Sequence, residues 1–431
     1  MFSLLNLVEY YRIRKECKKC EKNLIFDMKY LDERISKFAD KIYSKNQKLF
    51  IKQASYVSVV GFMASELYDL GGHTPCLVNL AESLYENKKM PLFITRINST
   101  YKRGKRTMNK LAKCCDIFGV DFHSYKFVSS LIELYNKIVQ NPPKVMFLYV
   151  HQHDILATAL IHLLKVNTDI KFAFFDHASH FPNLGMTMAN IIIEELTYTA
   201  KTLVEKRHIT DIPYRKCGLQ SKRKEDVKYY LKEELDKKRK ELGVKEKELL
   251  TVSGGSSYKY FEENGSTHYE MIKEILEKTP NLKHLAITNL TPEQVQIVDR
   301  IFENSPDAKK RLIFHQLTPQ FDILFQCADL FIDSFPISSA MTQIDLMGMK
   351  VPTVVKINLE NPTWTFHEYM PEDYPYMYER VEDMEKGILY LLSNKEERKK
   401  IAENNYQHWL VNYENDVVKE KYQDIIKEVL S

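Results

Sequence analysis

Short apolar runs that suit buried strands alternate with longer stretches that suit helices, and this alternation occurs twice along the chain. In the first block, strands are expected at 56–60, 92–97, 122–127, 145–150, 172–175 and 190–194. In the second block, strands are expected at 249–253, 284–288, 311–315, 330–333 and 353–356, with helices at 266–278, 291–304, 319–327 and 340–349. Strands that alternate with helices indicate βαβ units, whose strands run parallel within one sheet. The sequence therefore predicts an α/β fold with two domains in tandem.

A charged segment separates the two blocks, and helical segments flank them. Residues 1–50 combine dense charge with apolar residues that recur every three or four positions, which indicates a helical N-terminal extension. The first α/β domain is expected at 51–212 and the second at 248–394. Between them, residues 213–247 are rich in Lys, Arg and Glu, and we expect a charged helical connector there. Residues 395–431 are expected to form C-terminal helices.

Composition excludes several classes of protein. Hydrophobic residues make up 44% of the 431 residues and aromatic residues 12%, which is too much apolar surface for a disordered chain. No run of about 18 apolar residues occurs, so no membrane-spanning helix is expected. The apolar segment from Met1 to Leu7 lacks the charged start and the cleavage site of a signal peptide. The 62 basic side chains nearly balance the 58 acidic ones, so nucleic acid is not expected as the main partner.

The seven cysteines are scattered along the chain. Their number is odd, and Cys17 and Cys20 form the one pair with two-residue spacing. A zinc site with four cysteines is therefore not expected. Cysteines of this kind are typical of a reducing compartment, and the sequence predicts a cytoplasmic protein.

Titratable residues follow the predicted strands of the first block. Ligands of open parallel sheets bind at the carboxyl ends of the strands. His73 follows the first strand behind two glycines, and Asp176, His177 and His180 follow the strand at 172–175. Either His73 or the Asp176–His177 pair can act as a general base toward a hydroxyl group. Each of these histidines also fits a structural role.

A metal site is a second interpretation of the same edge. His151, His153, Asp176 and His180 are residue types that bind zinc. Their spacing fits no compact metal motif, so the sequence predicts no metal ion here.

One loop of the second block suits a phosphate-bearing ligand. Gly254, Gly255 and Ser256 follow the strand at 249–253, and such small residues leave backbone amides exposed. Lys259 adds a positive charge close by, and His315 follows another strand at the same predicted edge. The same residues also fit an ordinary tight turn.

A second loop of this block precedes a helix. Ser338 and Ser339 stand at its start, where free N-terminal amides can hold a phosphate. Asp345 lies one helical turn beyond Thr342, in a position from which it can accept ribose hydroxyl groups. A capped helix without a ligand fits the same pattern.

Short blocks within residues 55–356 resemble GT-B glycosyltransferases, and the likeness is closest to the O-GlcNAc transferase family and its bacterial relatives. In the second domain the similar blocks are 311–314, 328–333, Thr342-x-x-Asp345, Gly348-x-x-Val-Pro352 and the Tyr258-Lys259 pair. In the first domain they are 71–74, 174–185 and 189–193. The resemblance implies two Rossmann-like domains that face a central cleft, with the acceptor on residues 55–210 and the nucleotide-sugar donor on 249–356.

The resemblance also implies roles for individual residues. Lys259 would neutralise the leaving diphosphate, and Phe321 would lie against a uracil ring. Asp345 would bind the ribose, and His73 would lie beside the acceptor or the transferred sugar. Phosphate contacts would come from Ser338, Ser339 and Thr342. Gly72, His180, Lys102 and Arg103 would lie on the acceptor side.

Two departures from the family limit what the resemblance implies. Ala340 and Met341 stand where the family has His and Thr, so fewer side chains can contact phosphate. The chain has no 34-residue repeat, and the tetratricopeptide repeats that capture protein acceptors are absent. A glycan or lipid-linked acceptor is therefore expected ahead of a protein.

These features predict a bacterial glycosyltransferase of polysaccharide biosynthesis that uses a UDP-sugar. The resemblance implies inversion at the anomeric carbon without a metal ion or another cofactor. The basic run at 102–106 also suits a phosphate-bearing acceptor or an anionic surface at the inner face of a membrane. A nucleotide-sugar epimerase of the same fold is an alternative, and so is a non-catalytic assembly partner, which Ala340 and Met341 would suit.

Overall fold

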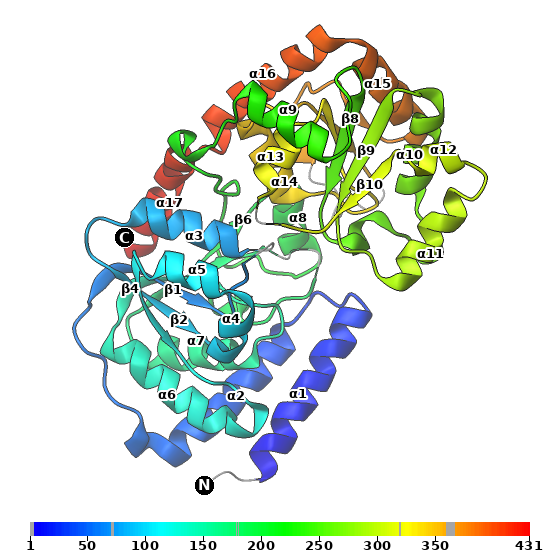
Figure 1. Cartoon of the computed structure of the whole chain (residues 1–431). Coiled ribbons are helices and arrows are strands. Elements are labelled where there is room, and N and C mark those ends of the chain that lie inside the picture. Colours follow the sequence, from blue (N-terminus) through cyan, green and yellow to red (C-terminus); the bar gives the residue numbers. More distant parts are fainter. Residues whose placement is uncertain (1–3, 70–72, 178, 180, 319, 359–366) are drawn as a thin grey trace. The chain divides into compact units, whose positions relative to one another are not determined.

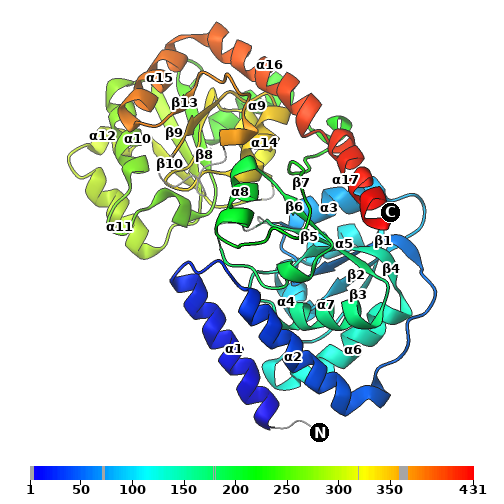
Figure 2. The same cartoon turned by 180° about the vertical axis from the view of Figure 1, so that it is seen from behind.

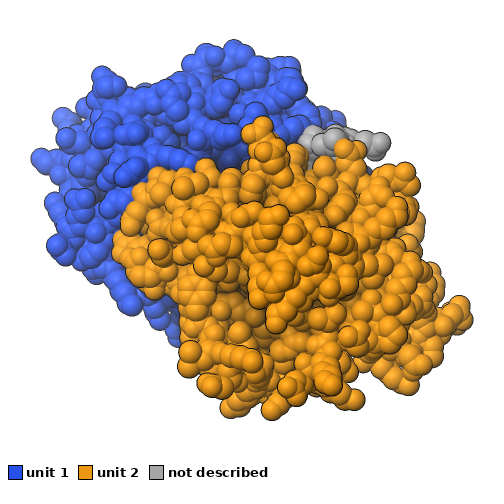
Figure 3. Space-filling view, turned by 90° about the horizontal axis from the view of Figure 1, so that it is seen from above, with its two compact units in different colours: residues 1–218, 418–431 blue, residues 219–417 orange. Residues whose placement is uncertain are grey.

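The computed structural model describes residues 4–69, 73–177, 179, 181–318, 320–358 and 367–431 (Figure 1). The chain divides into two compact units, which Figure 3 shows in two colours. The first unit contains residues 1–218 and 418–431, and the second contains residues 219–417. Each unit is built around one parallel sheet. The α/β fold predicted from the sequence is confirmed.

The sheet of the first unit has seven strands in the order β3-β2-β1-β4-β5-β6-β7, and all neighbours are parallel. The strands are β1 (Ser58–Ala64), β2 (Met90–Ile94), β3 (Cys115–Gly119), β4 (Pro143–Tyr149), β5 (Lys171–Phe175), β6 (Ile191–Glu194) and β7 (Tyr214–Lys216). The order reverses between β1 and β4, as it does in Rossmann-like domains. At such a reversal the connections leave in opposite directions, and a crevice opens beyond the carboxyl ends of the strands.

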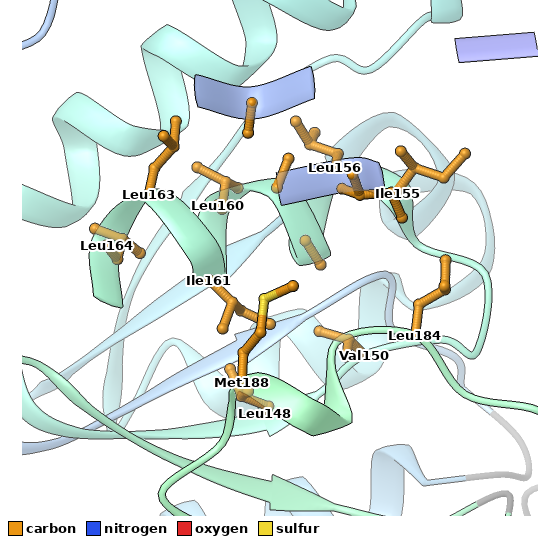
Figure 4. Close-up of a cluster of buried hydrophobic side chains, with 14 of the residues drawn as sticks. Leu148, Val150, Ile155, Leu156, Leu160, Ile161, Leu163, Leu164, Leu184 and Met188 are labelled. Atoms are coloured by element: carbon orange, nitrogen blue, oxygen red, sulfur yellow. The ribbon is translucent and has the colours of Figure 1, made fainter. Parts of the chain in front are cut away.

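Alternate residues of a strand point to opposite faces of the sheet, and both faces are covered. Leu148 of β4 packs in the core cluster that contains Leu160 and Ile161 of α7 (Ile155–Asn167), as Figure 4 shows. The ring centroid of the preceding residue, Phe147, lies 5.7 Å from that of Tyr422 in α17 (Asn415–Leu430). The C-terminal helix α17 thus returns to the first unit and covers its other face.

The N-terminal extension is helical, as expected, and consists of α1 (Leu4–Lys22) and α2 (Lys29–Asn46), which lie side by side (Figure 2). Buried apolar residues of α2, among them Leu31 and Ile35, join the core cluster of α7. Asp32 of α2 is also buried, and it accepts hydrogen bonds from the backbone N–H of Gly185 at 2.8 Å and from the Thr187 hydroxyl at 2.6 Å. The extension is therefore an integral part of the first unit.

Two strands of the first unit differ from the sequence prediction. The strand expected at 122–127 is wrong, because β3 is Cys115–Gly119 and α6 (Phe127–Gln140) already begins at Phe127. Phe122 and Phe127 are apolar for another reason, since their rings lie 6.1 and 5.3 Å from the ring of Tyr10 in α1. The short strand β7 lies in the segment expected as a connector, and its three residues are exposed, so no apolar pattern marks it.

The remaining helices of the first unit are α3 (Thr74–Leu84), α4 (Ile97–Arg103), α5 (Lys105–Leu111) and α8 (Thr197–Glu205). None of the helices in the described part of the chain is long and apolar enough to cross a membrane. All seven cysteines are buried.

The sheet of the second unit has six parallel strands in the order β10-β9-β8-β11-β12-β13. The strands are β8 (Leu249–Gly254), β9 (Leu282–Ile287), β10 (Leu312–His315), β11 (Leu330–Ile332), β12 (Thr353–Lys356) and β13 (Met377–Tyr378). This order reverses between β8 and β11, so the carboxyl ends of these two strands flank the crevice of this sheet.

The helices expected in the second block are confirmed as α10 (Thr267–Lys278), α11 (Pro292–Ile301), α13 (Phe321–Gln326) and α14 (Ala340–Gly348). Capping explains two of their starts: the Ser266 hydroxyl accepts from the backbone N–H of Tyr269, and Thr291 forms a capping box with Gln294. The unit also contains α9 (Lys232–Glu241), α12 (Pro306–Lys309), α15 (Val381–Ser393) and α16 (Lys395–Asn412).

Candidate active site

Three histidines meet at the carboxyl edge of the first sheet. His73 lies at the start of α3 in the connection after β1, His151 follows β4, and His177 follows β5. The ring centroid of His73 lies 4.2 Å from that of His177 and 5.3 Å from that of His151. Because β1, β4 and β5 are neighbours at the reversal of strand order, this histidine cluster stands at the crevice of the sheet.

His73 is held in the neutral form. Its side chain is buried, and burial lowers its pKa well below the usual value, with a further decrease from His177 and His151. One ring nitrogen is used in a hydrogen bond to the backbone of Glu66. The other, Nε2, is buried without a hydrogen-bond partner among the described residues. A neutral imidazole with one nitrogen left over has the protonation state that a general base needs.

Glu66 lies in the connection after β1 and contacts the histidine cluster. Its carboxylate is buried and accepts hydrogen bonds from the Tyr68 hydroxyl at 2.7 Å and from the Ser99 hydroxyl. His151 Nδ1 lies 3.7 Å from the same carboxylate, and the Tyr68 ring stacks on His151 at 5.9 Å. Burial alone would raise the pKa of Glu66, but the bonds from Ser99 and Tyr68 hold it below its usual value. Sequence reasoning missed both Glu66 and Tyr68, although they follow a predicted strand.

Asp176 has structural partners in the loop that follows it. Its buried carboxylate accepts a 2.5 Å hydrogen bond from Asn183 Nδ2 and lies 3.2 Å from Arg207 Nη2. Arg207 also donates to the carbonyl oxygens of Ser179 and Phe181, at 3.0 and 3.1 Å. This arrangement assigns Asp176 to holding the loop, and it leaves His73 as the better base of the two that the sequence indicated.

The other acceptor-side predictions have different positions. Gly72 and His180 lie outside the described residues. Lys102 and Arg103 end α4 and are exposed, and Arg103 Nη1 lies 4.0 Å from the carboxylate of Glu66. Arg103 therefore borders the histidine cluster.

The residues of the alternative metal site lie against separate partners. His151 faces Glu66, His153 Nδ1 lies 3.7 Å from Glu21, and Asp176 is paired with Arg207. Among the described residues, which exclude His180, no group of three or more His, Cys, Asp or Glu side chains could hold a metal ion.

In the second unit, Lys259 and Asp333 connect the two loops at the reversal of strand order. Lys259 lies in the turn after β8, and its Nζ donates a 2.9 Å hydrogen bond to the carbonyl oxygen of Ser338. Burial lowers the pKa of Lys259, and the nearby Asp333 opposes that decrease. Asp333 follows β11 and accepts from the Ser338 hydroxyl, from the backbone N–H and hydroxyl of Ser339 at 3.0 and 2.5 Å, and from Gln343 Nε2 at 2.7 Å.

This network changes the expected roles of two serines. Ser338 and Ser339 are buried, and both hydroxyls donate to Asp333, so they are not directed to a ligand. Helix α14 begins directly after Ser339, and the backbone N–H groups of its first turn have no partner within the helix. Phosphate contacts at this loop would come from these amides, from Thr342 and from Lys259.

The residues at the end of β8 and in the turn after it have different roles. Gly254 is required for packing, because a Cβ atom there would lie 2.8 Å from Cζ of Phe325 in α13. Ser256 is exposed in the turn that leads to Lys259, and Gly255 donates its backbone N–H to Ile287. Ser256 is therefore accessible to a ligand, whereas the backbone amide of Gly255, which the sequence offered as a phosphate contact, is already used.

Asp345 and Phe321 belong to a second cluster of this unit, organised by Lys222. Lys222 Nζ lies 3.1 Å from the carboxylate of Asp322 and 5.7 Å from the centroid of the Phe321 ring. Asp345 accepts a 3.2 Å hydrogen bond from Ser221. Burial raises the pKa of Asp345 to about 6, and Lys222 opposes this increase. Ser221 and Lys222 lie in the segment expected as a connector, where nothing in the sequence distinguishes them from the other charged residues.

His315 lies apart from these clusters along the sheet. It ends β10, the outermost strand, and its Nδ1 lies 2.7 Å from the carbonyl oxygen of Gln316. The structure thus brings together Lys259 with Ser338 and Asp333, and Phe321 with Lys222 and Asp345, but not His315 with either group.

Several solved structures have the same architecture. A glycosyltransferase from Rickettsia africae superposes with a TM-score of 0.69 at 14% identity, over 87% of this chain and 100% of that one. Anabaena HepE in complex with UDP-glucose has a TM-score of 0.64 at 10% identity, over 86% and 99%. A mutant O-GlcNAc transferase from Thermobaculum terrenum has a TM-score of 0.60 at 11% identity, over 98% and 77%. No protein-family model matches the sequence, and no curated protein does. The chain has the GT-B fold of these glycosyltransferases.

Proposed function

We propose that this protein is a glycosyltransferase that transfers a sugar from a nucleotide sugar, with UDP as the nucleotide. The observation that carries the proposal is the junction between Lys259 and the loop before α14. The 2.9 Å bond from Lys259 Nζ to Ser338 places a half-buried ammonium group beside the first turn of a helix. A positive charge and the N-terminal end of a helix together suit a diphosphate. The complexes of HepE with UDP and UDP-glucose support this choice of ligand.

On the donor side, the chain would stabilise the departure of the nucleotide diphosphate. Glycosyl transfer passes through an oxocarbenium-like state, and negative charge develops on the leaving phosphate oxygen as its bond to the sugar breaks. Lys259 and the first-turn amides of α14 would stabilise that charge in a buried setting, where such groups act most strongly. Asp345 would accept the ribose hydroxyls, and Phe321 would lie against the base.

On the acceptor side, His73 would take the proton of the attacking hydroxyl group. It is neutral, and its Nε2 atom has no hydrogen-bond partner among the described residues. Glu66 and Tyr68 would hold His151 beside it. The proposed reaction inverts the anomeric carbon, needs no metal ion and uses a glycan, a lipid-linked sugar or a protein as acceptor.

Thermal unfolding in the presence of nucleotides tests the proposal. UDP, GDP, CMP and ADP are added separately, each with Mg²⁺ and with EDTA. A ligand at about a hundred times its Kd adds about 2.7 kcal/mol, which raises the Tm of a domain of this size by roughly 5–10 °C. We expect this increase with UDP, unchanged by EDTA and absent in Lys259→Ala. If none of the four nucleotides raises the Tm, the donor site is refuted. A protein that converts the donor sugar without an acceptor would be an epimerase.

A further inference from the structure

A basic cavity lies in the first unit between α1 and the connections that follow β2, β3 and β4. Its volume is about 460 Å³. Arg14 and Lys18 line it from α1, and Arg96 lines it from the connection after β2. His123, His151 and His153 complete the titratable lining. Among the described residues that line this cavity there are three cations and no carboxylate. Asp121, Glu66 and Glu21 lie behind the lining, 3.4, 3.7 and 3.7 Å from His123, His151 and His153.

The basic wall on α1 has a regular spacing. Tyr10, Arg14 and Lys18 are four residues apart and share one face of the helix, so the two cations lie close to each other. Neither Arg14 nor Lys18 has a carboxylate within 4 Å in the described part of the chain, although Glu9 and Glu16 lie on the same helix. Both glutamates instead pair with Arg34 of α2, at 2.7 and 2.6 Å. Glu9 and Glu16 therefore hold α1 to α2, while Arg14 and Lys18 remain available at the cavity.

No carboxylate oxygen lies within 4 Å of Arg96 among the described residues, although Asp154 and Glu66 are near enough to raise its pKa. Asp154 is the carboxylate whose charge acts most on Arg96 and raises its pKa. That carboxylate is already used, because it accepts from the Ser65 hydroxyl at 2.6 Å, from Thr95 and from the backbone N–H of Ala157 at 3.0 Å. The Arg96 guanidinium thus keeps its donors for another acceptor.

The histidines add donors that are not themselves charged. Burial lowers the pKa of His153, with Arg96 and Lys18 lowering it further against the opposing charge of Glu21. His151 is affected in the same way by burial and by Arg96, with Glu66 opposing. The Nε2 atom of His153 is buried and has no hydrogen-bond partner in the described chain. An anion in the cavity would supply an acceptor for it.

We propose that this cavity binds the phosphate group of a phosphorylated sugar that serves as the acceptor. A phosphate has several acceptor oxygens and matches the fork of an arginine, and two guanidinium groups and one ammonium group stand around this cavity. A volume of about 460 Å³ holds a phosphate together with part of the sugar that carries it. This inference rests on the proposed function, because it names the acceptor of that reaction.

His151 connects the cavity to the proposed base. It lines the cavity, and its ring centroid lies 5.3 Å from that of His73. A sugar phosphate whose phosphate lies between Arg14 and Arg96 therefore presents its ring hydroxyls toward the histidine cluster. The N-terminal helix α1 thereby becomes a recognition element for the acceptor.

Calorimetric titration of inorganic phosphate tests the cavity directly. The titration uses the full chain at low salt, with saturating UDP present so that the donor site is occupied. Arg14→Gln/Lys18→Gln should weaken phosphate binding at least tenfold, because it removes two charges from the cavity wall. The matched control is Lys15→Gln/Lys19→Gln, which removes the same charge from exposed positions of α1 outside the cavity lining. It should leave the Kd for phosphate within about twofold.

Two outcomes would overturn the proposal: phosphate that does not bind at millimolar concentration, and phosphate binding that both double variants weaken equally. Arg96→Gln provides a second variant, at a lining cation outside α1. UDP binding is measured separately in the same samples, so a failure of the donor site is distinguished from a failure of the cavity.

Competition identifies the source of the phosphate. Glucose, glucose 1-phosphate and a prenyl-linked glucosyl phosphate in detergent each compete with inorganic phosphate. We expect the two phosphorylated compounds to displace it and glucose to have no effect. Tighter binding of the prenyl-linked compound would identify a lipid-linked acceptor, and equal binding a soluble sugar phosphate. Failure of both to compete would refute the assignment.

Discussion

The Nζ atom of Lys259 donates a 2.9 Å hydrogen bond to the carbonyl oxygen of Ser338. The bond joins the turn after β8 to the loop that leads into α14. These two connections leave the sheet in opposite directions, so the bond spans the crevice of the second sheet. This bond therefore fixes the Lys259 ammonium group close to the N-terminal end of α14, the two positive features of the proposed donor site.

Replacing Lys259 should impair catalysis far more than stability. Lys259→Met keeps the length of the side chain and removes the charge, so we expect kcat to fall about 10²–10³-fold, as for loss of one transition-state donor. The free energy of unfolding should change by less than about 1 kcal/mol, because burial already disfavours the charged ammonium group. Steady-state rates and urea unfolding measure the two effects. Lys310→Met, at an exposed position, is the control, and a large loss of stability with normal kcat would contradict the assigned role.

The pKa of Asp345 predicts how donor binding depends on pH. Burial raises this pKa to about 6, against the charge of Lys222, and only the ionised carboxylate accepts two ribose hydroxyls. The Kd for UDP-glucose should therefore increase up to about tenfold between pH 7 and pH 5. UDP-glucose is the suitable probe because its diphosphate does not titrate in this range. Asp345→Asn should bind weakly at both pH values, and a pH dependence that persists in this variant would assign the titration to another group.

The proposed donor residues could be selected from the sequence because each lies close to a strand end or a helix start. Lys259 follows β8, and Asp345 lies on a helix that begins after β11, so the alternating pattern placed both at one sheet edge. The direction in which a hydroxyl group points could not be predicted from the sequence. Ser338 and Ser339 look like phosphate ligands in the sequence, yet both donate to Asp333, since a buried carboxylate requires hydrogen bonds.

Other residues could not be found because their pattern has more than one physical cause. Phe122 and Phe127 have the apolar character of a strand, but they are apolar because they pack against Tyr10 of α1. Lys222 is one cation in a run of charged residues, and only the folded chain places it between Asp322 and Phe321. Such long-range contacts leave no local signal in the sequence.

His73 should be the base of the transfer reaction, and its pKa sets the pH profile. We expect His73→Gln to lower kcat about 10²–10⁴-fold without a change in UDP affinity. Burial and the neighbouring His177 and His151 lower the pKa of His73 well below its usual value, so the base stays neutral in mild acid. The profile of kcat at saturating UDP-glucose, where the effect of Asp345 on donor affinity no longer counts, should therefore remain flat as the pH falls through 6.5. A decrease centred near 6.5 would point to a different base, and His162→Gln on α7 serves as the control.

Buried neutral histidines should make the fold sensitive to acid. Burial lowers the pKa of His284 to about 3, and its ring nitrogens lie 2.9 and 3.0 Å from the hydroxyls of Thr251 and Ser253. In the unfolded chain this histidine takes up a proton near pH 6.5, so the stability it contributes is present above 6.5 and is lost as the pH falls. The slope is about 1.4 kcal/mol per pH unit for one such group. Urea unfolding of His284→Gln between pH 7 and 4 should show a shallower slope; an unchanged slope would exclude His284 as the cause.

Gly254 should be indispensable to the packing of the second sheet. A Cβ atom at this position would lie 2.8 Å from Cζ and 2.9 Å from Cε1 of Phe325, whose ring is buried between α13 and the strand. Gly254→Ala should therefore displace the ring and lower the free energy of unfolding by about 1–3 kcal/mol, as overpacking of a core does. Gly265→Ala is the matched control, because nothing lies within 4 Å of a Cβ atom there. Urea unfolding measures both variants, and equal stabilities would show that Phe325 yields without cost and that Gly254 is retained for another reason.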